Sequence, residues 1–387
     1  MNESVPSIHF LSAVDWPETT LRCEEAAWDA ELLGPWRDLE RRSSSTSFFQ
    51  SPDWCEAWVE AARACGQPET PRIATIWRGR TLVLLWPLSV RQLSFCRILH
   101  HLGEPATQYG DVLIDKREDR DLLFGIAWDM VRNWHDVDTI ELRRVRDDTA
   151  LASQLARHRV AGSQASAPML DFRSLDGGSA DGQRTGRTRQ ALRRHQRQLA
   201  EHGPVSFALA QRPEEQCLLI EHAFALKRVW QQEKGAVSAG YAHGASLGCL
   251  LRLAREGWLL AAYLRTGDEI AAIEIGAVSQ GRYWSLVQSY DLRFAKHAPG
   301  RLLFWHLLEC CPELSIDVFD FLAPAHRHKL EWANREVPIA DYLIPVSRRG
   351  RLAATYLGRI RPVLRECYHL LPSGLRQHAG KLLHRLG

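Results

Sequence analysis

The sequence predicts a mixed α/β protein in which most strands pair antiparallel and helices flank the sheet. Its 387 residues are 45% hydrophobic and 25% charged, the balance of a soluble globular protein with room for two or three domains. Strand-like and helix-like runs alternate along the second half of the chain. Two tight turns, Thr266-Gly267-Asp268 and Ser279-Gln280-Gly281, join three successive strand-like runs and therefore force an antiparallel meander.

The first half contains a clear helix start at Ser51. Ser51 has the side chain of an N-cap, and Pro52 follows at the first helical position, where a missing N–H costs little. The turn Arg78-Gly79-Arg80 predicts a β-hairpin. The strands of this hairpin are expected at 72–77 and 81–90, followed by a strand at 111–114, a helix at 118–134 and a strand at 139–143.

The second half reads as an arginine-rich helix followed by the order β-α-α-β-β-β-α-β-α-β. The first helix is expected over 187–201, where Gly203-Pro204 ends it. The elements that follow are expected at 205–208, 213–232, 243–256, 258–264, 269–278, 282–290, 300–311, 316–321, 326–334 and 341–346.

A shift in composition separates the two halves. Residues 161–186 are rich in Gly, Ser, Ala and Asp, which is typical of an exposed loop or linker. We therefore predict an N-terminal half over 1–165, a linker over 166–186, a C-terminal domain over 187–346 and a basic helical tail over 347–387.

Charge and cysteine usage limit the class of protein. The net charge of +3 gives no sign of a specific nucleic-acid partner. The nine cysteines are scattered without a Cys-x-x-Cys pair, which favours reduced thiols and a cytoplasmic location. We expect no signal peptide, no membrane span and no metal site, since the sixteen histidines lack ligand spacing.

The tail carries nine Lys and Arg but one acid, and it divides at Pro372-Ser373-Gly374. Apolar residues share one helical side before and after this break, at 352, 356, 360, 363 and 364 and then at 375, 379, 382 and 386. This pattern fits helices that rest on the inner face of an anionic membrane. The commoner explanation of such a pattern is helices that pack on the body with an arginine-rich outer face.

The junction from Tyr290 to Leu303 is the most informative segment. A strand leads through a loop into a helix that starts at Pro299-Gly300. Unpaired N–H groups of a first helical turn attract anions. The sequence therefore predicts an anion site at Gly300, Arg301, Leu302 and Leu303, or else an ordinary strand–loop–helix connection.

Several stretches of the chain, in their order and spacing, match one known family: 49–54, 86–88, 189–203, 290–291, 298–303, 320–322, 328–329 and Trp332. Through these stretches the chain resembles, from about residue 45 to residue 335, the GNAT superfamily of N-acetyltransferases, and more narrowly its CelD-like group, associated with cellulose biosynthesis. In place of the superfamily's Gln/Arg-x-x-Gly-x-Gly/Ala, the chain has Lys296-His-Ala-Pro-Gly-Arg-Leu. The Fem-type transferases, a related branch, use aminoacyl-tRNA, and their aromatic-Lys-x-x-aromatic box resembles His328-Lys329-Leu-Glu-Trp332.

This resemblance implies tandem GNAT-like domains, each a mostly antiparallel twisted sheet flanked by helices. It implies acetyl-CoA or another acyl-CoA as co-substrate, with its diphosphate at 300–303 and its pantetheine beside Gln288 and Ser289. In such enzymes a substrate amine attacks a thioester. Lys329 is then a candidate catalytic contact for the oxyanion or for an anionic acceptor, or else a surface lysine; Trp332 is a candidate acceptor contact.

Three further residues are candidates for acid–base work. Glu274 lies within an apolar strand, where burial would raise its pKa toward that of a general base, although a solvent-facing position explains it equally well. Asp291 either orients the amine or caps the loop, and His328 is either a base or a surface histidine. For Asp320 we expect a structural hydrogen-bonding role.

Two groups of residues are candidates for acceptor binding. Arg189 and Arg193 belong to a dense arginine patch that either holds phosphates of the acceptor or of CoA, or is a solvated face. Tyr109 and Asp111 either face a cleft shared by the two halves or belong to a core turn.

The favoured interpretation is an acyl-CoA-dependent N-acyltransferase acting on an amine of a sugar, a nucleotide sugar or a cell-envelope precursor. One rival is a Fem-like transferase that uses aminoacyl-tRNA. Another is a non-catalytic accessory protein of a polysaccharide-synthesis machine.

Overall fold

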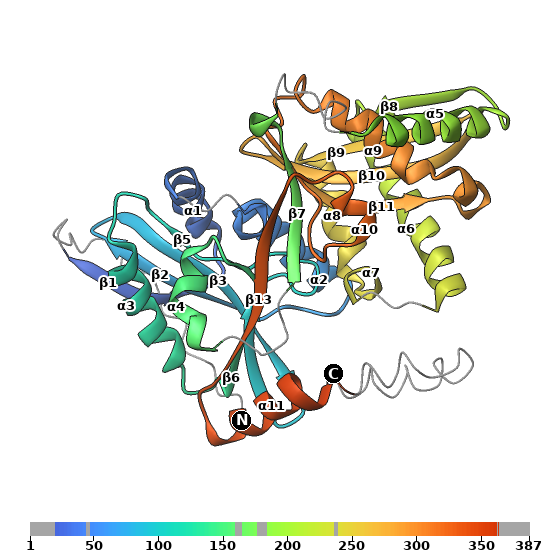
Figure 1. Cartoon of the computed structure of the whole chain (residues 1–387). Helices are drawn as coiled ribbons and strands as arrows, with labels where there is room; N and C mark the ends of the chain where they lie inside the picture. Colours follow the sequence, from blue (N-terminus) through green and yellow to red (C-terminus); the bar gives the residue numbers. More distant parts are fainter. Residues whose placement is uncertain are drawn as a thin grey trace.

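The computed structural model describes residues 20–43, 47–158, 165–175, 184–235, 239–361 and 363. These residues form one thirteen-stranded mixed sheet in the order β1-β2-β3-β4-β6-β13-β7-β12-β11-β10-β9-β8, with β5 paired to β3 (Figure 1). The predicted mixed α/β class is confirmed. The Asp176–Gly182 loop, the break at Pro372-Ser373-Gly374 and the apolar stretch after it lie outside the described residues.

The strands have the following bounds: β1 Leu21–Ala26, β2 Pro71–Arg78, β3 Thr81–Leu93, β4 Cys96–His101, β5 Leu113–Ile114, β6 Thr139–Arg146, β7 Ala165–Asp171, β8 Val205–Leu209, β9 Leu259–Thr266, β10 Glu269–Ser279, β11 Arg282–Tyr290, β12 Val318–Asp320 and β13 Arg335–Pro345. The helices are α1 Ala30–Arg42, α2 Pro52–Ala64, α3 Arg120–Arg132, α4 Ala150–Leu155, α5 Gly186–Ala200, α6 Pro213–Lys234, α7 Ala239–Ala242, α8 Ala245–Arg255, α9 Pro299–Cys310, α10 Arg327–Leu330 and α11 Arg348–Thr355.

Local sequence signals account for several of these elements. The Ser51 hydroxyl accepts a hydrogen bond from the Trp54 N–H at 3.1 Å, so the predicted cap of α2 is confirmed. The β2–β3 hairpin and the antiparallel β9-β10-β11 meander also form as predicted. The order of elements expected from residue 205 onward is confirmed, with the short helix α7 added.

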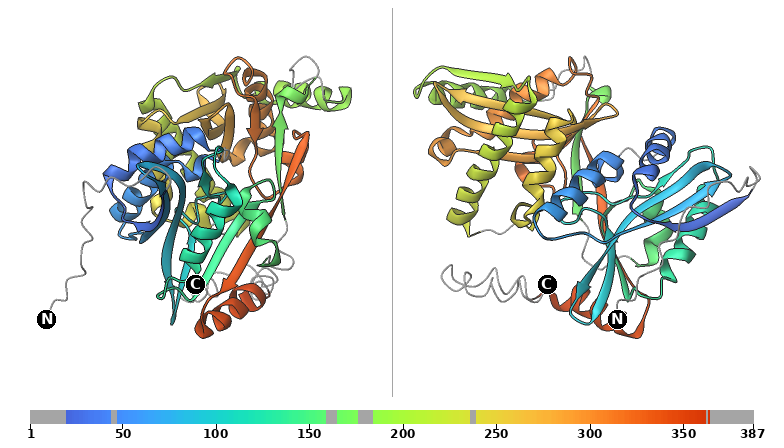
Figure 2. Two further views of the ribbon diagram at one scale, coloured as in Figure 1. Left: turned by 90° about the vertical axis from the view of Figure 1, so that its left-hand side faces the viewer. Right: turned by 180° about the vertical axis from the view of Figure 1, so that it is seen from behind.

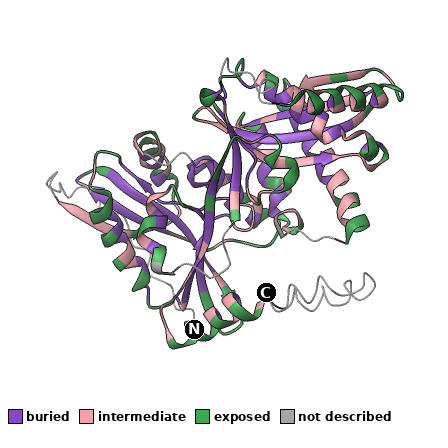
Figure 3. Ribbon diagram, viewed as in Figure 1, coloured by how far each residue is buried: buried purple, intermediate pink, exposed green. Residues whose placement is uncertain are grey.

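The part of the sheet from β9 to β12 has helices on both faces. Ile273 and Ile275 of β10 belong to a core that α2, α6 and α8 share. Ala272 of the same strand belongs to a second core, which includes residues of α5 and α9. Figure 2 shows α6 and α8 on one side of these strands. Figure 3 shows that the strands of the sheet are largely buried.

The two halves of the chain share this sheet through β7 and β13. β13 pairs with β6 over Ile339–Pro345 and with β7 over Arg335–Ile339, and β7 also pairs with β12. The interpretation of 166–186 as an exposed loop is therefore wrong at its beginning, where Ala167, Met169 and Leu170 are buried strand residues. Small residues and Pro168 hide this strand in the sequence. The domain boundaries themselves stay a prediction.

The described part of the tail packs on the body through α11. Gly350, Ala353 and Leu357 are buried, and the Gly350 carbonyl accepts a hydrogen bond from the Thr139 hydroxyl at 3.0 Å. Leu352, on the predicted apolar side, is 64% exposed. The described part of the tail thus packs on the body, as one interpretation of the sequence predicts, and still leaves Leu352 of its apolar side exposed. No helix among the described residues has the length and hydrophobicity required to span a bilayer.

Candidate active site

Strands β11 and β12 diverge and form a fork in the sheet. They pair in parallel over only three positions, from Arg282 opposite Val318 to Trp284 opposite Asp320. β12 then ends, whereas β11 continues to Tyr290 through an irregularity beside Ile275 and Gly276 of β10. Beyond Trp284, the edge of β11 that faces β12 has no strand partner in the described part of the chain.

Glu274 is a fully buried carboxylate on β10 beside this fork. It lies opposite Gln288 and accepts a hydrogen bond from the Ser285 hydroxyl, while its Oε2 has no hydrogen-bond partner among the described residues. Burial raises the pKa of Glu274 to about 8, against the opposing effects of Ser285, Lys329 and Lys227. The alternative of a solvent-facing glutamate is therefore wrong.

Lys329, on α10, reaches the fork from the β12 side. Its Nζ donates a hydrogen bond to the Leu322 carbonyl at 2.9 Å. Burial lowers the pKa of Lys329 to about 8, although Glu274 and Asp320 act to raise it. Because the pKa values of both Glu274 and Lys329 lie near neutrality, this pair has the properties of acid–base groups.

Two residues that the sequence did not reveal contact the part of β11 beyond Trp284. Lys227 of α6 donates a hydrogen bond to the Gln288 carbonyl at 3.1 Å, and the Tyr241 hydroxyl donates to the Leu286 carbonyl at 3.3 Å. Burial lowers the pKa of Lys227, against the opposing effect of Glu274. A single lysine in a helix with many charged residues carries no sequence signal.

The start of α9 offers fewer donors than predicted. Both Arg301 N–H and Leu302 N–H donate to the Ala298 carbonyl, at 3.0 and 3.2 Å, so the expectation that they are unpaired is wrong. Ala298 is the N-cap residue of α9, and an N-cap carbonyl ordinarily accepts the first hydrogen bonds of its helix. In the described part of the chain, the Gly300 N–H keeps no partner.

The side chains expected to contact CoA are only partly available. The Gln288 amide donates to the Gly300 carbonyl at 3.4 Å, which joins the end of β11 to the start of α9. Arg301 forms an ion pair with Glu331 at 2.9 Å. Ser289 is buried and donates to the Ala223 carbonyl of α6, and Leu302 and Leu303 are core residues. Contact of Ser289 with the donor stays a prediction. Leu302 and Leu303 are predicted to bind the diphosphate through their backbone N–H groups, and the burial of their side chains does not test that prediction.

The other predicted acid–base residues have local roles. Asp291 accepts from the Arg293 N–H at 2.8 Å; burial acts to raise its pKa, but the bonds from Arg293 outweigh burial and lower it. Asp291 thus has the loop-capping geometry. Burial and Lys329 lower the pKa of His328 to about 4, so it is a neutral imidazole at pH 7. Trp332 is buried, with the Arg184 guanidinium 3.8 Å from its ring centroid.

Tyr109 and Asp111 lie in the interior of the described structure. Both are buried, and the Tyr109 hydroxyl donates to the carboxylate of Asp320 at 2.9 Å. Contact of Tyr109 or Asp111 with an acceptor stays a prediction. Asp320 accepts further hydrogen bonds from Arg146 and Arg282, the structural role that the sequence predicts for it.

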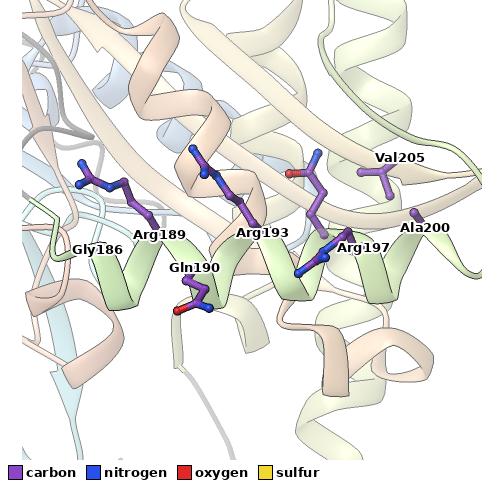
Figure 4. A pocket seen from close by; sticks show the side chains of 8 residues that line it. Gly186, Arg189, Gln190, Arg193, Arg197, Ala200 and Val205 are labelled. Atoms are coloured by element: carbon purple, nitrogen blue, oxygen red, sulfur yellow. The ribbon is translucent and has the colours of Figure 1, made fainter.

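The arginine patch of α5 lines an open hollow (Figure 4). Arg189, Arg193 and Arg197 line it at intervals of four residues, with Gln190 and Gln196 between them. α5 contains no acidic residue. Its His195 is close enough to Arg301 of α9 for that charge to lower the pKa of His195, after the larger effects of burial and Arg194. The described residues contain no metal-binding cluster.

Comparison with known proteins identifies the family of this region. Residues 186–330 match the family model described as an acetyltransferase (GNAT) domain. No curated protein matches the chain.

Solved structures with a similar fold span both halves of the chain. FemX has 9% identity, with 84% of this chain and 96% of that chain covered at a TM-score of 0.56. The C-terminal domain assigned to a lysylphosphatidylglycerol synthetase of Agrobacterium fabrum has 13% identity, with 85% of this chain and 97% of that chain covered at a TM-score of 0.52. A conserved protein of unknown function from Bacteroides thetaiotaomicron has 11% identity, with 84% of this chain and 100% of that chain covered at a TM-score of 0.51.

At these identities the likeness shows the fold, and the predicted GNAT-like α/β architecture is confirmed. The segment that holds the fork, Glu274 and Lys329 is thus a GNAT acetyltransferase domain, and the protein that carries it is an acyltransferase.

Proposed function

We propose that the protein is an N-acyltransferase of the CelD-like group that takes an acyl group from acyl-CoA and transfers it to an amine of a sugar, a nucleotide sugar or a cell-envelope precursor. The observation that carries this proposal is the β11–β12 fork with Glu274 and Lys329 beside it. Its location would be the cytoplasm, where free thiols such as Cys55 and Cys249 stay reduced.

The fork and its surroundings fit an acyl-CoA. An extended pantetheine chain can pair with the edge of β11 as an added strand does. The unpaired Gly300 N–H lies at the positive end of α9, where a diphosphate is favoured. The hollow on α5 supplies Arg193 and Arg197, two exposed guanidinium groups for further phosphates of the donor or of the acceptor.

The acid–base pair beside the fork fits acyl transfer to an amine. The amine nitrogen forms a bond to the thioester carbonyl carbon, the C–S bond breaks and releases CoA as its thiolate, and the amine gives up one proton. Glu274 accepts this proton, directly or through a water molecule, because its raised pKa matches that task. Lys329, when protonated, stabilises the negative charge on the tetrahedral oxygen.

Binding of the donor is the first test of the proposal. Acetyl-CoA and longer CoA esters should raise the melting temperature, because a ligand that binds only the folded state stabilises it. Aminoacyl-tRNA, the donor of the Fem-like alternative that the fold of FemX keeps open, should not. Stabilisation by aminoacyl-tRNA and not by CoA esters would replace the proposal with that alternative.

Release of free thiol tests catalysis. Thiol should appear when acetyl-CoA and amines of sugars or envelope precursors are supplied together. An accessory protein without activity would bind its partner yet release no thiol from any CoA ester.

The tail supports a second contact, with anionic lipid. Beside Arg348, Arg351 and Arg359, the side chains of Leu352, Ile360 and Val363 are exposed on the described part of the tail. Apolar side chains flanked by arginines suit the surface of an anionic membrane. We propose that this side of the tail brings the enzyme to its envelope substrates.

A further inference from the structure

Asp320 lies where β11 and β12 diverge, and four donors surround its carboxylate. Its Oδ1 accepts from the Tyr109 hydroxyl and from the Leu322 N–H, both at 2.9 Å. Its Oδ2 accepts from Arg146 at 2.8 Å and from Arg282 at 3.3 Å. Asp320 is fully buried, so these protein donors take the place of the water molecules that would hydrogen-bond an exposed carboxylate.

Two of these donors come from the other half of the chain. Tyr109 follows β4, and Arg146 ends β6; the Arg146 guanidinium also lies 5.1 Å from the centre of the Tyr109 ring. Tyr109 is itself held in place, because its carbonyl accepts from the Gln50 amide at 2.8 Å. The N-terminal half therefore presents a rigid pair of donors to the fork.

A single residue links Asp320 to Lys329. The N–H of Leu322 donates to Asp320, while its carbonyl accepts from the Lys329 ammonium at 2.9 Å. Leu322 has a left-handed backbone (φ 58°), a conformation that a leucine keeps only when its surroundings fix it. Any movement of Asp320 therefore moves the carbonyl to which Lys329 is bound.

We propose that the N-terminal half of the chain positions Lys329: Tyr109 and Arg146 fix Asp320, Asp320 fixes Leu322, and the Leu322 carbonyl orients the Lys329 ammonium at the fork. This inference rests on the proposed function only in giving Lys329 a role in the reaction. Tyr109, Arg146 and Asp320 are positioning residues, since each acts through another residue. The N-terminal half is then a working part of the acyltransferase site.

The charge of Asp320 also acts on the protonation of Lys329. The groups that face Lys329 are Glu274 of β10, Asp320 of β12, Lys227 of α6 and Arg144 of β6, with His326 and His328 beside it. The two acids favour the ammonium, whereas burial and the neighbouring cations oppose it. Removing the charge of Asp320 shifts this balance toward the neutral amine.

The test measures Lys329 directly and needs no turnover. The full-length protein is labelled with acetic anhydride in trace amounts at a series of pH values, and mass spectrometry gives the reactivity of each lysine. In Asp320→Asn the pH midpoint of Lys329 should fall by about one unit. In Tyr109→Phe, Lys329 should react about fivefold faster above its midpoint, because a lost hydrogen bond frees the Leu322 segment.

Two controls make the result decisive. Lys234, an exposed lysine at the end of α6, should react identically in every variant. Tyr263→Phe removes a hydroxyl that bonds Glu215, away from the fork, and should leave Lys329 unchanged. If Asp320→Asn does not fold, Tyr109→Phe decides alone.

Wild-type reactivity of Lys329 in folded Tyr109→Phe, together with a wild-type midpoint in any folded Asp320→Asn, would overturn the inference. Failure of the proposed function would show separately: no thiol would be released, while the variants would still change the reactivity of Lys329 as predicted.

Discussion

At the scale of single residues, two ionisable side chains lie beside the fork with pKa values shifted in opposite directions. Burial raises that of Glu274 and lowers that of Lys329, each to about 8. Opposite shifts to a common value are expected when a carboxyl and an amine are both desolvated and only partly compensate one another.

Replacement of Glu274 by glutamine should lower kcat about 100-fold or more, as expected for loss of a general base. In the wild type, kcat/KM should rise with pH up to about 8, because Glu274 holds its proton below that pH. The variant should lose this rise. A pH–rate profile checks both statements, and an unchanged profile would remove Glu274 from the reaction.

The same substitution should change stability with a defined sign. The folded-state pKa of Glu274 is raised above its unfolded value, so the folded state holds a proton that the unfolded state releases. Its contribution to stability is therefore lost as pH rises from about 4.3 to about 8. Glu274→Gln replaces the carboxyl group with an amide that stays neutral at every pH. The melting temperature of the variant relative to wild type should therefore increase between pH 5 and pH 8. An equal difference at both pH values would contradict the buried-carboxylate assignment.

Lys329→Ala should reduce kcat about 100-fold and leave the KM for the acyl donor nearly unchanged, because the lost contact is made mainly in the transition state. Lys234→Ala, at an exposed position of α6, is the matched control. A rise in KM with constant kcat would assign Lys329 to binding alone.

At the scale of elements, α5 has two different faces. Leu192 and Leu199 are buried against the body, whereas Arg189, Arg193 and Arg197 line the hollow. A helix without acids that keeps arginines four residues apart presents a row of positive charge.

Arg193→Ala combined with Arg197→Ala should weaken binding of the phosphate-bearing substrate about tenfold at low salt, with less effect at high salt. Arg187→Ala combined with Arg194→Ala removes the same charge from positions outside the hollow and serves as the control. Equal losses in the two double variants would show a general effect of charge.

Local signals in the sequence define some elements well and others poorly. The Ser51 cap, the meander turns and the break at Gly203-Pro204 act within a few residues, so the elements beside them could be predicted. β4 and β7 could not, because His100, His101 and Pro168 interrupt the strand pattern, and distant partners create these strands.

The candidate site shows the same division. Glu274 stands out because a carboxylate within an apolar strand requires an explanation. Neither the link from Tyr109 to Asp320, 211 positions apart, nor the contact between Lys227 and Gln288 has a local signature. The first joins the segment after β4 to β12, and the second joins α6 to the end of β11, so both depend on tertiary packing.

At the scale of the whole molecule, one sheet carries both halves, and β13 and β7 lie between them (Figure 1). Buried ion pairs across this junction, such as Arg146 with Asp320, are costly to break when one partner is removed. The halves are therefore expected to unfold together.

The tail should bring the molecule to anionic membranes. Leu352→Glu should abolish binding to vesicles that contain phosphatidylglycerol and leave the melting temperature unchanged, because Leu352 is 64% exposed. Leu218→Glu, at a position of α6 that is 67% exposed, is the control and should still bind. Wild-type vesicle binding by Leu352→Glu would contradict the lipid contact.

The central claim is that the acyl donor binds at the fork beside the start of α9. Calorimetric titration with acetyl-CoA tests it most directly, using Gly300→Trp, which places bulk beside Gln288, and Gly125→Trp, whose position has open space around it. We predict that wild type and Gly125→Trp bind alike and that Gly300→Trp does not bind. Equal binding by all three proteins would contradict the account.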